Sequence, residues 1–273
     1  MFKPQEKQRV AASFSQAATT YDSFADLQRA VGTRLLSLLP EELLPEKVQQ
    51  PLNSKTINNW LDLGCGTGHF AGQLQKQWPK ALGIGLDLAE GMLQFSRLRY
   101  PPIHYLCADA EHLPLADNSQ DLIFSSLALQ WCPDFSAVLN EIKRVLKPGG
   151  LLLFSSIADG SLVELNKSWQ AVDAKKHVNQ FRTFKNYTNL VSSSDLEMID
   201  LHCYQHIYHY EKVRDLTHEL KYLGANHIQT GRAQGLVGRK GFQRFLNTYE
   251  TYRQPQGLPA TWQVVYGVLR KGE

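Results

Sequence analysis

Long apolar runs are missing from this 273-residue chain, so the sequence predicts no membrane-spanning helix. The first seven residues are polar and lack the apolar segment of a signal peptide. An excess of one charge is also missing, because the formal net charge of +3 is too small to indicate nucleic-acid binding by itself. We therefore expect a globular protein that works away from membranes and nucleic acids.

Cysteine is scarce, and the four cysteines are scattered as Cys65, Cys107, Cys132 and Cys203 with no CxxC pair. This spacing argues against a zinc site, and we expect no metal. It favours reduced thiols, and hence a cytoplasmic location.

The most informative segment that is present covers residues 60–68, which read WLDLGCGTG. Apolar residues lead into Asp62, and Gly64, Gly66 and Gly68 then alternate before a helical pattern begins. Glycine lets the backbone approach a ligand that a Cβ would repel. A strand, a glycine loop and a helix in this order are typical of a nucleotide-like ligand site. The glycines could also serve only a tight turn.

Asp87 ends the next strand-like run, about 20 residues after the loop, which is the spacing of an acceptor for ribose hydroxyls. Alone it could equally cap a helix. The loop reads GxGxG and not the GxGxxG of dinucleotide folds, and Asp62 suits an ammonium group better than a pyrophosphate. Together these features predict S-adenosylmethionine as the cofactor.

Further cofactor contacts are expected where later strands end. Asp109 could accept from the adenine amino group and the Ala110 amide could donate to a ring nitrogen, although Asp109 could also be a solvated loop acid. Carbonyls around Leu127 could hold the methionine ammonium. No Asn/Asp-Pro-Pro-Tyr box for a flipped base follows the fourth strand. The predicted cofactor set is Gln28, Asp62, Gly64, Cys65, Gly66, Gly68, Asp87, Leu88, Asp109, Ala110 and Leu127.

Strand and helix patterns alternate regularly from residue 56 to residue 157, which predicts a parallel sheet covered on both faces. Strands are expected to end at 62 and to cover 81–87, 103–108, 121–127 and 151–157, with helices over 67–77, 89–97 and 134–146 and a turn at 147–150. Two helices are expected within 4–39, with Asp22 as the N-cap of the second, before a linker at 40–55. Later come a helix at 162–176, an irregular stretch to 195, a strand at 198–209, helices at 212–224 and 240–252, and a strand at 262–270.

Residues 56–157 resemble class I S-adenosylmethionine-dependent methyltransferases through the Asp62, glycine-loop, Asp87 and Asp109 motifs. The resemblance implies an α/β, Rossmann-like fold with a seven-stranded, mostly parallel sheet, helices on both faces and an added helical cap. We expect residues 1–55 to contribute part of the cap and 56–157 to form the cofactor-binding core. Residues 158–273 would supply cap insertions and the final strands.

The flanks resemble malonyl-acyl-carrier-protein O-methyltransferases of biotin synthesis in residues 21–28 (YDSFADLQ), 178–181 (VNQF), 220–227 (LKYLGANH) and 235–239 (GLVGR). Two departures are Asn226, where the family commonly has Thr, and residues 182–185, where it usually has a Pro-containing run. The resemblance implies methylation of the free carboxylate of a malonyl thioester on carrier protein or coenzyme A. Tyr21 and Phe181 match positions that line the methyl-transfer pocket, although both could be ordinary core aromatics.

A carboxylate is already ionised at neutral pH, so this reaction needs no general base, and the sequence shows no Ser-His-Asp or Cys-His arrangement. An arginine could hold the substrate carboxylate, and Arg239 and Arg182 are the candidates. Between Glu219 and Glu250 there is no acidic residue, yet Lys221, Arg232, Arg239, Lys240 and Arg244 occur. Lys240 and Arg244 could therefore attract an acidic carrier protein, or the run could be a solvated surface.

Two alternatives remain open at this point. One is another small-molecule methyltransferase, such as a C-methyltransferase of quinone synthesis, which would need a positioned base. The other is a catalytically silent protein that binds the cofactor or a partner, against which the intact motif set argues.

Overall fold

The computed structural model describes residues 4–43, 56–223 and 238–273, which build one seven-stranded sheet in the order β3-β2-β1-β4-β5-β7-β6. The strands are β1 (Asn59–Leu63), β2 (Leu82–Asp87), β3 (His104–Cys107), β4 (Gln120–Ser126), β5 (Leu146–Ile157), β6 (Leu196–Tyr210) and β7 (Leu258–Lys271). β1 to β5 are parallel, whereas β7 runs antiparallel to both β5 and β6. The predicted fold class is confirmed.

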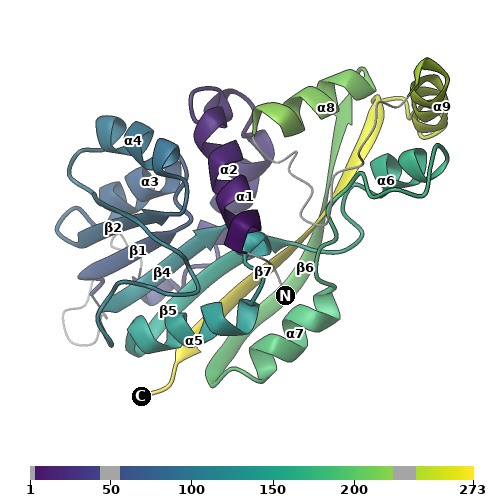
Figure 1. Cartoon of the computed structure of the whole chain (residues 1–273). Coiled ribbons are helices and arrows are strands. Elements are labelled where there is room, and N and C mark those ends of the chain that lie inside the picture. Colours follow the sequence, from purple (N-terminus) through teal and green to yellow (C-terminus); the bar gives the residue numbers. More distant parts are fainter. Residues whose placement is uncertain (1–3, 44–55, 224–237) are drawn as a thin grey trace.

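Helices cover both faces of the sheet (Figure 1). They are α1 (Pro4–Ala17), α2 (Asp26–Leu36), α3 (His69–Gln77), α4 (Glu90–Arg99), α5 (Phe135–Val145), α6 (Val163–Gln170), α7 (Phe184–Ser192), α8 (Val213–Tyr222) and α9 (Arg239–Glu250), with short 3-10 turns η1 (Tyr21–Ser23), η2 (Glu41–Leu43) and η4 (Leu129–Trp131). One core joins the sheet to α2, α3, α8 and α9, and a second core joins it to α5 and α7. Because α2 shares a core with the sheet, it holds the start of the chain close to the ends of the strands.

Helix α5 illustrates how the sequence specifies these elements. Its apolar residues recur at helical spacing, so Val138, Ile142 and Val145 all become fully buried against the sheet. Burial of each such side chain contributes about 1.5–3 kcal/mol. Asp134 begins the helix, because its side chain accepts from the Ala137 N–H at 3.0 Å.

Three expectations about local structure were wrong. Asp22 does not cap the second helix, because the N-cap of α2 is Ala25 and Asp22 lies in η1. The stretch expected to be irregular before residue 195 contains α7, which Thr183 caps by accepting from the Asn186 N–H at 3.1 Å. The expected turn at 147–150 is part of β5, where Gly149 adopts a φ of 69°. Of the expected linker at 40–55, residues 44–55 lie outside the described part of the chain.

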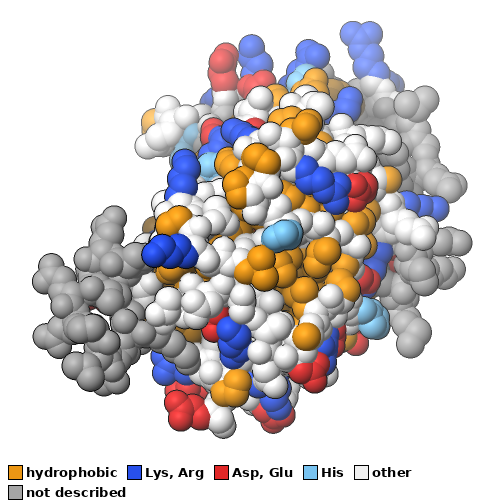
Figure 2. Space-filling model, turned by 90° about the vertical axis from the view of Figure 1, so that its left-hand side faces the viewer, with side chains coloured by type: hydrophobic (Ala, Val, Ile, Leu, Met, Phe, Trp, Pro, Cys, Tyr) orange, Lys and Arg blue, Asp and Glu red, His pale blue; other side chains and the backbone are white. Residues whose placement is uncertain are grey.

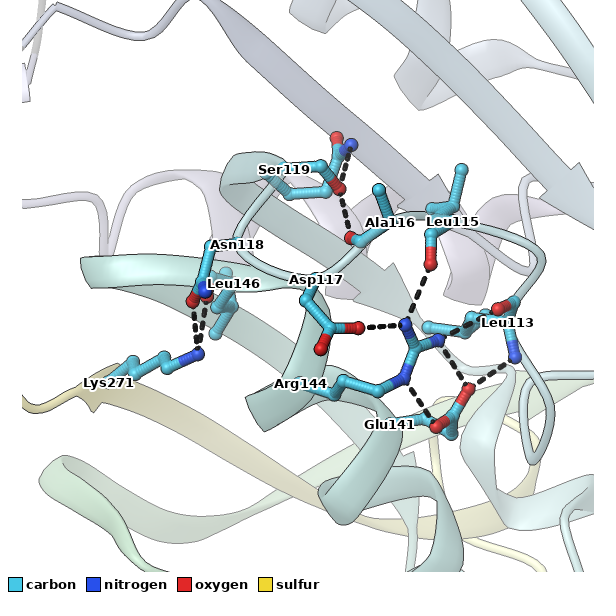
Figure 3. Close-up of polar contacts among 11 residues, drawn as sticks. Leu113, Leu115, Ala116, Asp117, Asn118, Ser119, Glu141, Arg144, Leu146 and Lys271 are labelled. Carbon is cyan, nitrogen blue, oxygen red and sulfur yellow. Dashed lines mark hydrogen bonds and ion pairs between the residues drawn. The ribbon is translucent and has the colours of Figure 1, made fainter.

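The loop between β3 and β4 is fastened to α5 by Arg144 (Figure 3). The guanidinium donates to the Leu113 and Leu115 carbonyls and pairs with Glu141 at 2.8 Å and Asp117 at 2.7 Å. Glu141 in turn accepts from the Leu113 N–H at 2.7 Å. Hydrogen bonds from Arg144 hold the pKa of Glu141 below its usual value. These contacts fix a loop that follows directly on the expected adenine contacts.

Figure 2 looks at the side where β2 and α4 lie in Figure 1, and hydrophobic side chains gather near its centre among charges of both signs. Within the described ranges, no helix has the length and apolar character needed to span a membrane.

Candidate active site

Three cavities meet at the side chain of Tyr21, which contributes to the lining of each. The strand-end cavity, of about 830 Å³, lies where β1, β2 and β4 end and is closed by α1. The loop cavity, of about 470 Å³, lies beside the glycine loop and includes Asp62. The apolar cavity, of about 1010 Å³, lies between η4, α6, α8 and the stretch that carries Phe181.

The glycine loop provides the wall that the strand-end and loop cavities share. Gly64 has a φ of +78°, and a Cβ there would meet the Ala128 Cβ at 2.2 Å. Gly66 has a φ of +54°, and a Cβ there would project into open space with no atom within 4 Å. Gly68 lies outside the cavities, because it caps α3 and packs against Ser96 and Tyr100. Two of the three predicted glycines therefore face the site directly.

Asp87 ties the end of β2 to the glycine loop. Its Oδ2 accepts from the Gly66 N–H at 2.9 Å, and its Oδ1 accepts from the Ala89 N–H at 2.8 Å. Burial raises the pKa of this carboxyl, while the backbone N–H groups of Ala89 and Gly66 oppose that rise. Each carboxylate oxygen can accept a further hydrogen bond from a ligand in the strand-end cavity. Asp87 could therefore bind a ligand that carries two adjacent hydroxyl groups.

Asp62 is a buried carboxyl with one oxygen that has no partner among the described residues. The residue is 2% exposed, and no donor among the described residues contacts its Oδ2 atom. Burial raises its pKa to about 8, and the neighbouring charge of Asp87 adds to the rise. A cationic group in the loop cavity would satisfy Oδ2 and restore the charged form. The buried Oε1 of Gln28, which lines the same cavity, is also without a partner in the described part of the chain.

Helix α1 closes the strand-end cavity through Lys7. The Lys7 ammonium lies 2.6 Å from Asp109 Oδ2 and 2.7 Å from Glu111 Oε2. Burial lowers the pKa of Lys7, but its hydrogen bonds to Asp109 and Glu111 raise it overall. Asp109 therefore faces the cavity while its carboxylate is already bonded to α1. A ligand that bonds Asp109 would contact the same carboxylate that holds this helix.

Four other predicted cofactor residues lie around the same cavities. Leu88, Ala110 and Leu127 line the strand-end cavity, and Cys65 lines the loop cavity. Leu127 has a positive φ of 50°, which an L residue adopts at a cost in strain. Its N–H donates to the Ser155 hydroxyl at 3.1 Å, and this hydrogen bond holds the turn in place. The turn lies between the strand-end and apolar cavities, because Leu127 lines both.

Tyr21 is held in place by its neighbour Asp22. Asp22 accepts from the Thr67 hydroxyl of the glycine loop at 2.7 Å and pairs with Arg99 of α4. Burial raises the pKa of Tyr21, and the nearby charges of Asp87 and Asp22 add to the rise, so its hydroxyl stays protonated. Phe181 lies across the apolar cavity, which Phe14, Trp131 and Trp169 also line.

The four predicted cations do not line the three converging cavities. Arg182 lies next to Phe181, but its guanidinium donates to the Cys132 and Pro133 carbonyls at 2.7 and 2.6 Å. Arg239, Lys240 and Arg244 are exposed on α9, where Lys240 and Arg244 line an open surface groove. Arg232, with the rest of 224–237, lies outside the described residues, and so do the family-like residues 224–227 and 235–237.

A histidine–aspartate pair on the wall of the apolar cavity was not predicted from the sequence. His177 Nε2 lies 2.8 Å from Asp173 Oδ1, and the His177 ring stacks on Trp169. The spacing D-x-x-x-H was visible where the helix expected at 162–176 gives way to the stretch expected to be irregular, but nothing in the sequence placed it beside a cavity. The role of Lys7 was also missed, because 102 positions separate it from Asp109. Among the described residues, no cluster of three or more His, Cys, Asp or Glu could hold a metal ion.

Comparison with known proteins places this geometry among methyltransferases. Residues 61–154 match a family described as a methyltransferase domain. The malonyl-acyl-carrier-protein O-methyltransferase of Yersinia pestis is 40% identical to this chain, over 97% of the chain and 91% of its own length. The enzyme of the same name from Serratia marcescens is 38% identical, over 96% of the chain and 95% of its own length. The biotin biosynthesis bifunctional protein BioHC of Cellvibrio japonicus is 44% identical over 97% of the chain, which spans 50% of that longer protein.

Solved structures show the same fold at low sequence identity. A Haloferax volcanii chain, solved in complex with a methyltransferase activator, matches with a TM-score of 0.60 at 18% identity, over 97% of this chain and 98% of its own. The YcgJ protein of Bacillus subtilis matches with a TM-score of 0.57 at 16% identity, over 90% and 99%. These likenesses support the sheet topology and are silent on the substrate.

Proposed function

The chain belongs to the malonyl-acyl-carrier-protein O-methyltransferase family, and we propose that it converts the free carboxylate of a malonyl thioester into a methyl ester. The cofactor is S-adenosylmethionine. The observation that carries the proposal is the convergence at Tyr21 of two cofactor-side cavities and one large apolar cavity. The product ester would hide a charge from enzymes that elongate fatty acyl chains, as an early step of biotin synthesis requires.

The residues present fit S-adenosylmethionine on two observations. Asp62 Oδ2 in the loop cavity, which has no partner among the described residues, suits the ammonium of the methionine part, and Gln28 lines the same cavity. The open face of Gly66 leaves room for the cofactor against the backbone, next to Asp87, which would accept from the ribose hydroxyls. When bound, the cofactor supplies a methyl group on a sulfonium, which a carboxylate oxygen takes while the sulfur keeps the electron pair of the broken bond.

The protein's own contribution would be alignment and exclusion of water. A malonyl carboxylate is an anion at neutral pH, so its oxygen is nucleophilic without loss of a proton. Alignment of the reacting atoms can supply much of the rate acceleration. Tyr21 and Phe181, which both line the apolar cavity, would wall off the transfer point, and aromatic faces stabilise a sulfonium. Asp22 would act as a positioning residue, because it fastens η1 to the glycine loop.

We further propose that α9 contributes to docking of the acyl carrier protein. Arg239, Lys240 and Arg244 are exposed on this helix, and the groove lined by Lys240 and Arg244 contains no acidic side chain. Such a surface would attract an acidic carrier protein. A cytoplasmic location stays a prediction, supported by four cysteines without disulfides.

The function is tested with purified protein and methyl-labelled S-adenosylmethionine. Malonyl-carrier protein, malonyl-coenzyme A and acetyl-carrier protein are offered as acceptors. We expect label on the two malonyl thioesters and none on acetyl-carrier protein, which lacks the free carboxylate. Label on acetyl-carrier protein, or on no thioester, would contradict the proposed function.

A further inference from the structure

The apolar cavity is lined almost wholly by uncharged side chains. Phe14, Leu162, Leu165, Trp169 and Phe181 give it an apolar wall, with a few amide and hydroxyl groups between them. Among its described lining residues, His177 alone can carry a positive charge. A substrate whose reacting group is a carboxylate would be costly to bury there without a cationic partner.

His177 is built into this wall by contacts on two sides. Asp173 holds Nε2 at 2.8 Å, and the other ring nitrogen has no partner within the described part of the chain. The ring lies over Trp169 with centroids 4.2 Å apart and planes 9° apart, and Trp169 stacks in turn on Phe245 of α9 at 4.1 Å. The His177 side chain is only 10% exposed. Asp173 and the face of Trp169 therefore fix the orientation of the ring.

We propose that His177, oriented by Asp173, binds the free carboxylate of the malonyl group. This inference rests on the proposed function and names a residue that would recognise the substrate carboxylate. The geometry suits the reaction, because an imidazolium with one nitrogen on Asp173 offers a single N–H. One carboxylate oxygen would be held and the other left to attack, whereas an arginine fork would occupy both.

The same pair could instead serve as a base, as a neutral substrate would require, and the two roles differ in their kinetics. A carboxylate loses negative charge as its oxygen takes the methyl group. An imidazolium therefore stabilises the bound substrate at least as well as the transition state, and its removal should raise KM and leave kcat nearly unchanged. Removal of a base would lower kcat.

The test uses the full chain with His177→Phe, which preserves a flat ring over Trp169 and removes both ring nitrogens. Calorimetry measures the affinity of the S-adenosylhomocysteine-loaded protein for malonyl-coenzyme A and for the methyl ester of malonyl-coenzyme A. We expect affinity for the acid to fall about tenfold or more and affinity for the ester to change less than about twofold. His177→Gln, which retains one amide donor, should lose less.

His202→Phe is the matched control, because His202 also bonds an aspartate, Asp200, at 2.9 Å and stacks over an aromatic ring, yet lines none of the three cavities. It should change neither affinity. Equal losses on acid and ester, no loss on either, or a collapse of kcat at unchanged KM would each overturn the assignment of His177. Because the wild-type protein must first methylate malonyl-coenzyme A, failure of the proposed function would be recognised separately. Asp173→Asn should reproduce the loss on the acid to a smaller degree, since the ring stays in place.

Discussion

Replacement of Asp87 by alanine would remove one carboxylate that serves two purposes. In the protein alone, the change frees the N–H groups of Gly66 and Ala89, which donate to Asp87 at 2.9 and 2.8 Å. In the complex, it also removes the proposed charged acceptor for two ribose hydroxyls. Hydrogen bonds to a charged group contribute about 1.5–3 kcal/mol. We therefore expect the cofactor's Kd to rise about ten- to a hundredfold.

Calorimetric titration of Asp87→Ala with S-adenosylmethionine or S-adenosylhomocysteine measures this change directly. Asp134→Ala is the matched control, because Asp134 also accepts from a backbone N–H, that of Ala137 at 3.0 Å, but caps α5 and lines none of the three cavities. It should cost about 1 kcal/mol of stability and leave the cofactor's affinity unchanged. Unchanged affinity in a folded Asp87→Ala variant would refute the ribose assignment.

Three further predictions address the nucleophile, the carrier protein and the loop before β4. With both substrates saturating, kcat should stay level from about pH 6 to 8, since no proton leaves the nucleophile; a tenfold rise per pH unit would instead indicate a phenol or carbon nucleophile. The double variant Lys240→Glu and Arg244→Glu should raise KM for malonyl-carrier protein severalfold at low salt and leave malonyl-coenzyme A unaffected, whereas Lys185→Glu on α7 should change neither; equal effects on both substrates would exclude α9 as the docking surface. The pKa of Glu141 is lowered from 4.5 in the folded protein, so its stabilisation is present above pH 4.5 and is lost as the pH falls through the folded value. Glu141→Gln should therefore lower the free energy of unfolding by about 1 kcal/mol at neutral pH, and denaturant titrations that show an equal deficit well below pH 4.5 would argue against this contribution.

The fold could be predicted from the sequence because its signals are local. The glycine loop and the alternation of apolar runs each lie within a few residues, and they located every strand to within about five residues. Helix α7 was missed because its surroundings are polar and aromatic, although Thr183 gave a capping signal and Tyr187 and Val191 have helical spacing. Asp22 resembled a cap, but tertiary contacts with Thr67 and Arg99 determine its position.

The site was only partly predictable, because its far wall is assembled from distant segments. Asp62, Gly64 and Asp87 could be found from one motif and one spacing, since β1 and β2 end at the same edge of the sheet. The contact of Lys7 with Asp109 and the position of His177 depend on how α1 and the stretch after α6 fold back over that edge. Arg182 has the right charge and neighbours for a clamp, yet backbone carbonyls occupy its guanidinium.

Methylation of the malonyl carboxylate is tested by identifying the bond that the protein forms. The protein is incubated with malonyl-carrier protein and S-adenosylmethionine carrying a ¹³C-methyl group, and the product is analysed by NMR before and after mild alkali. We expect an oxygen-bound methyl resonance that is absent when acetyl-carrier protein replaces malonyl-carrier protein, and we expect alkali to release this methyl group as methanol. A carbon-bound methyl group that survives alkali, or no transfer to the malonyl group, would contradict it.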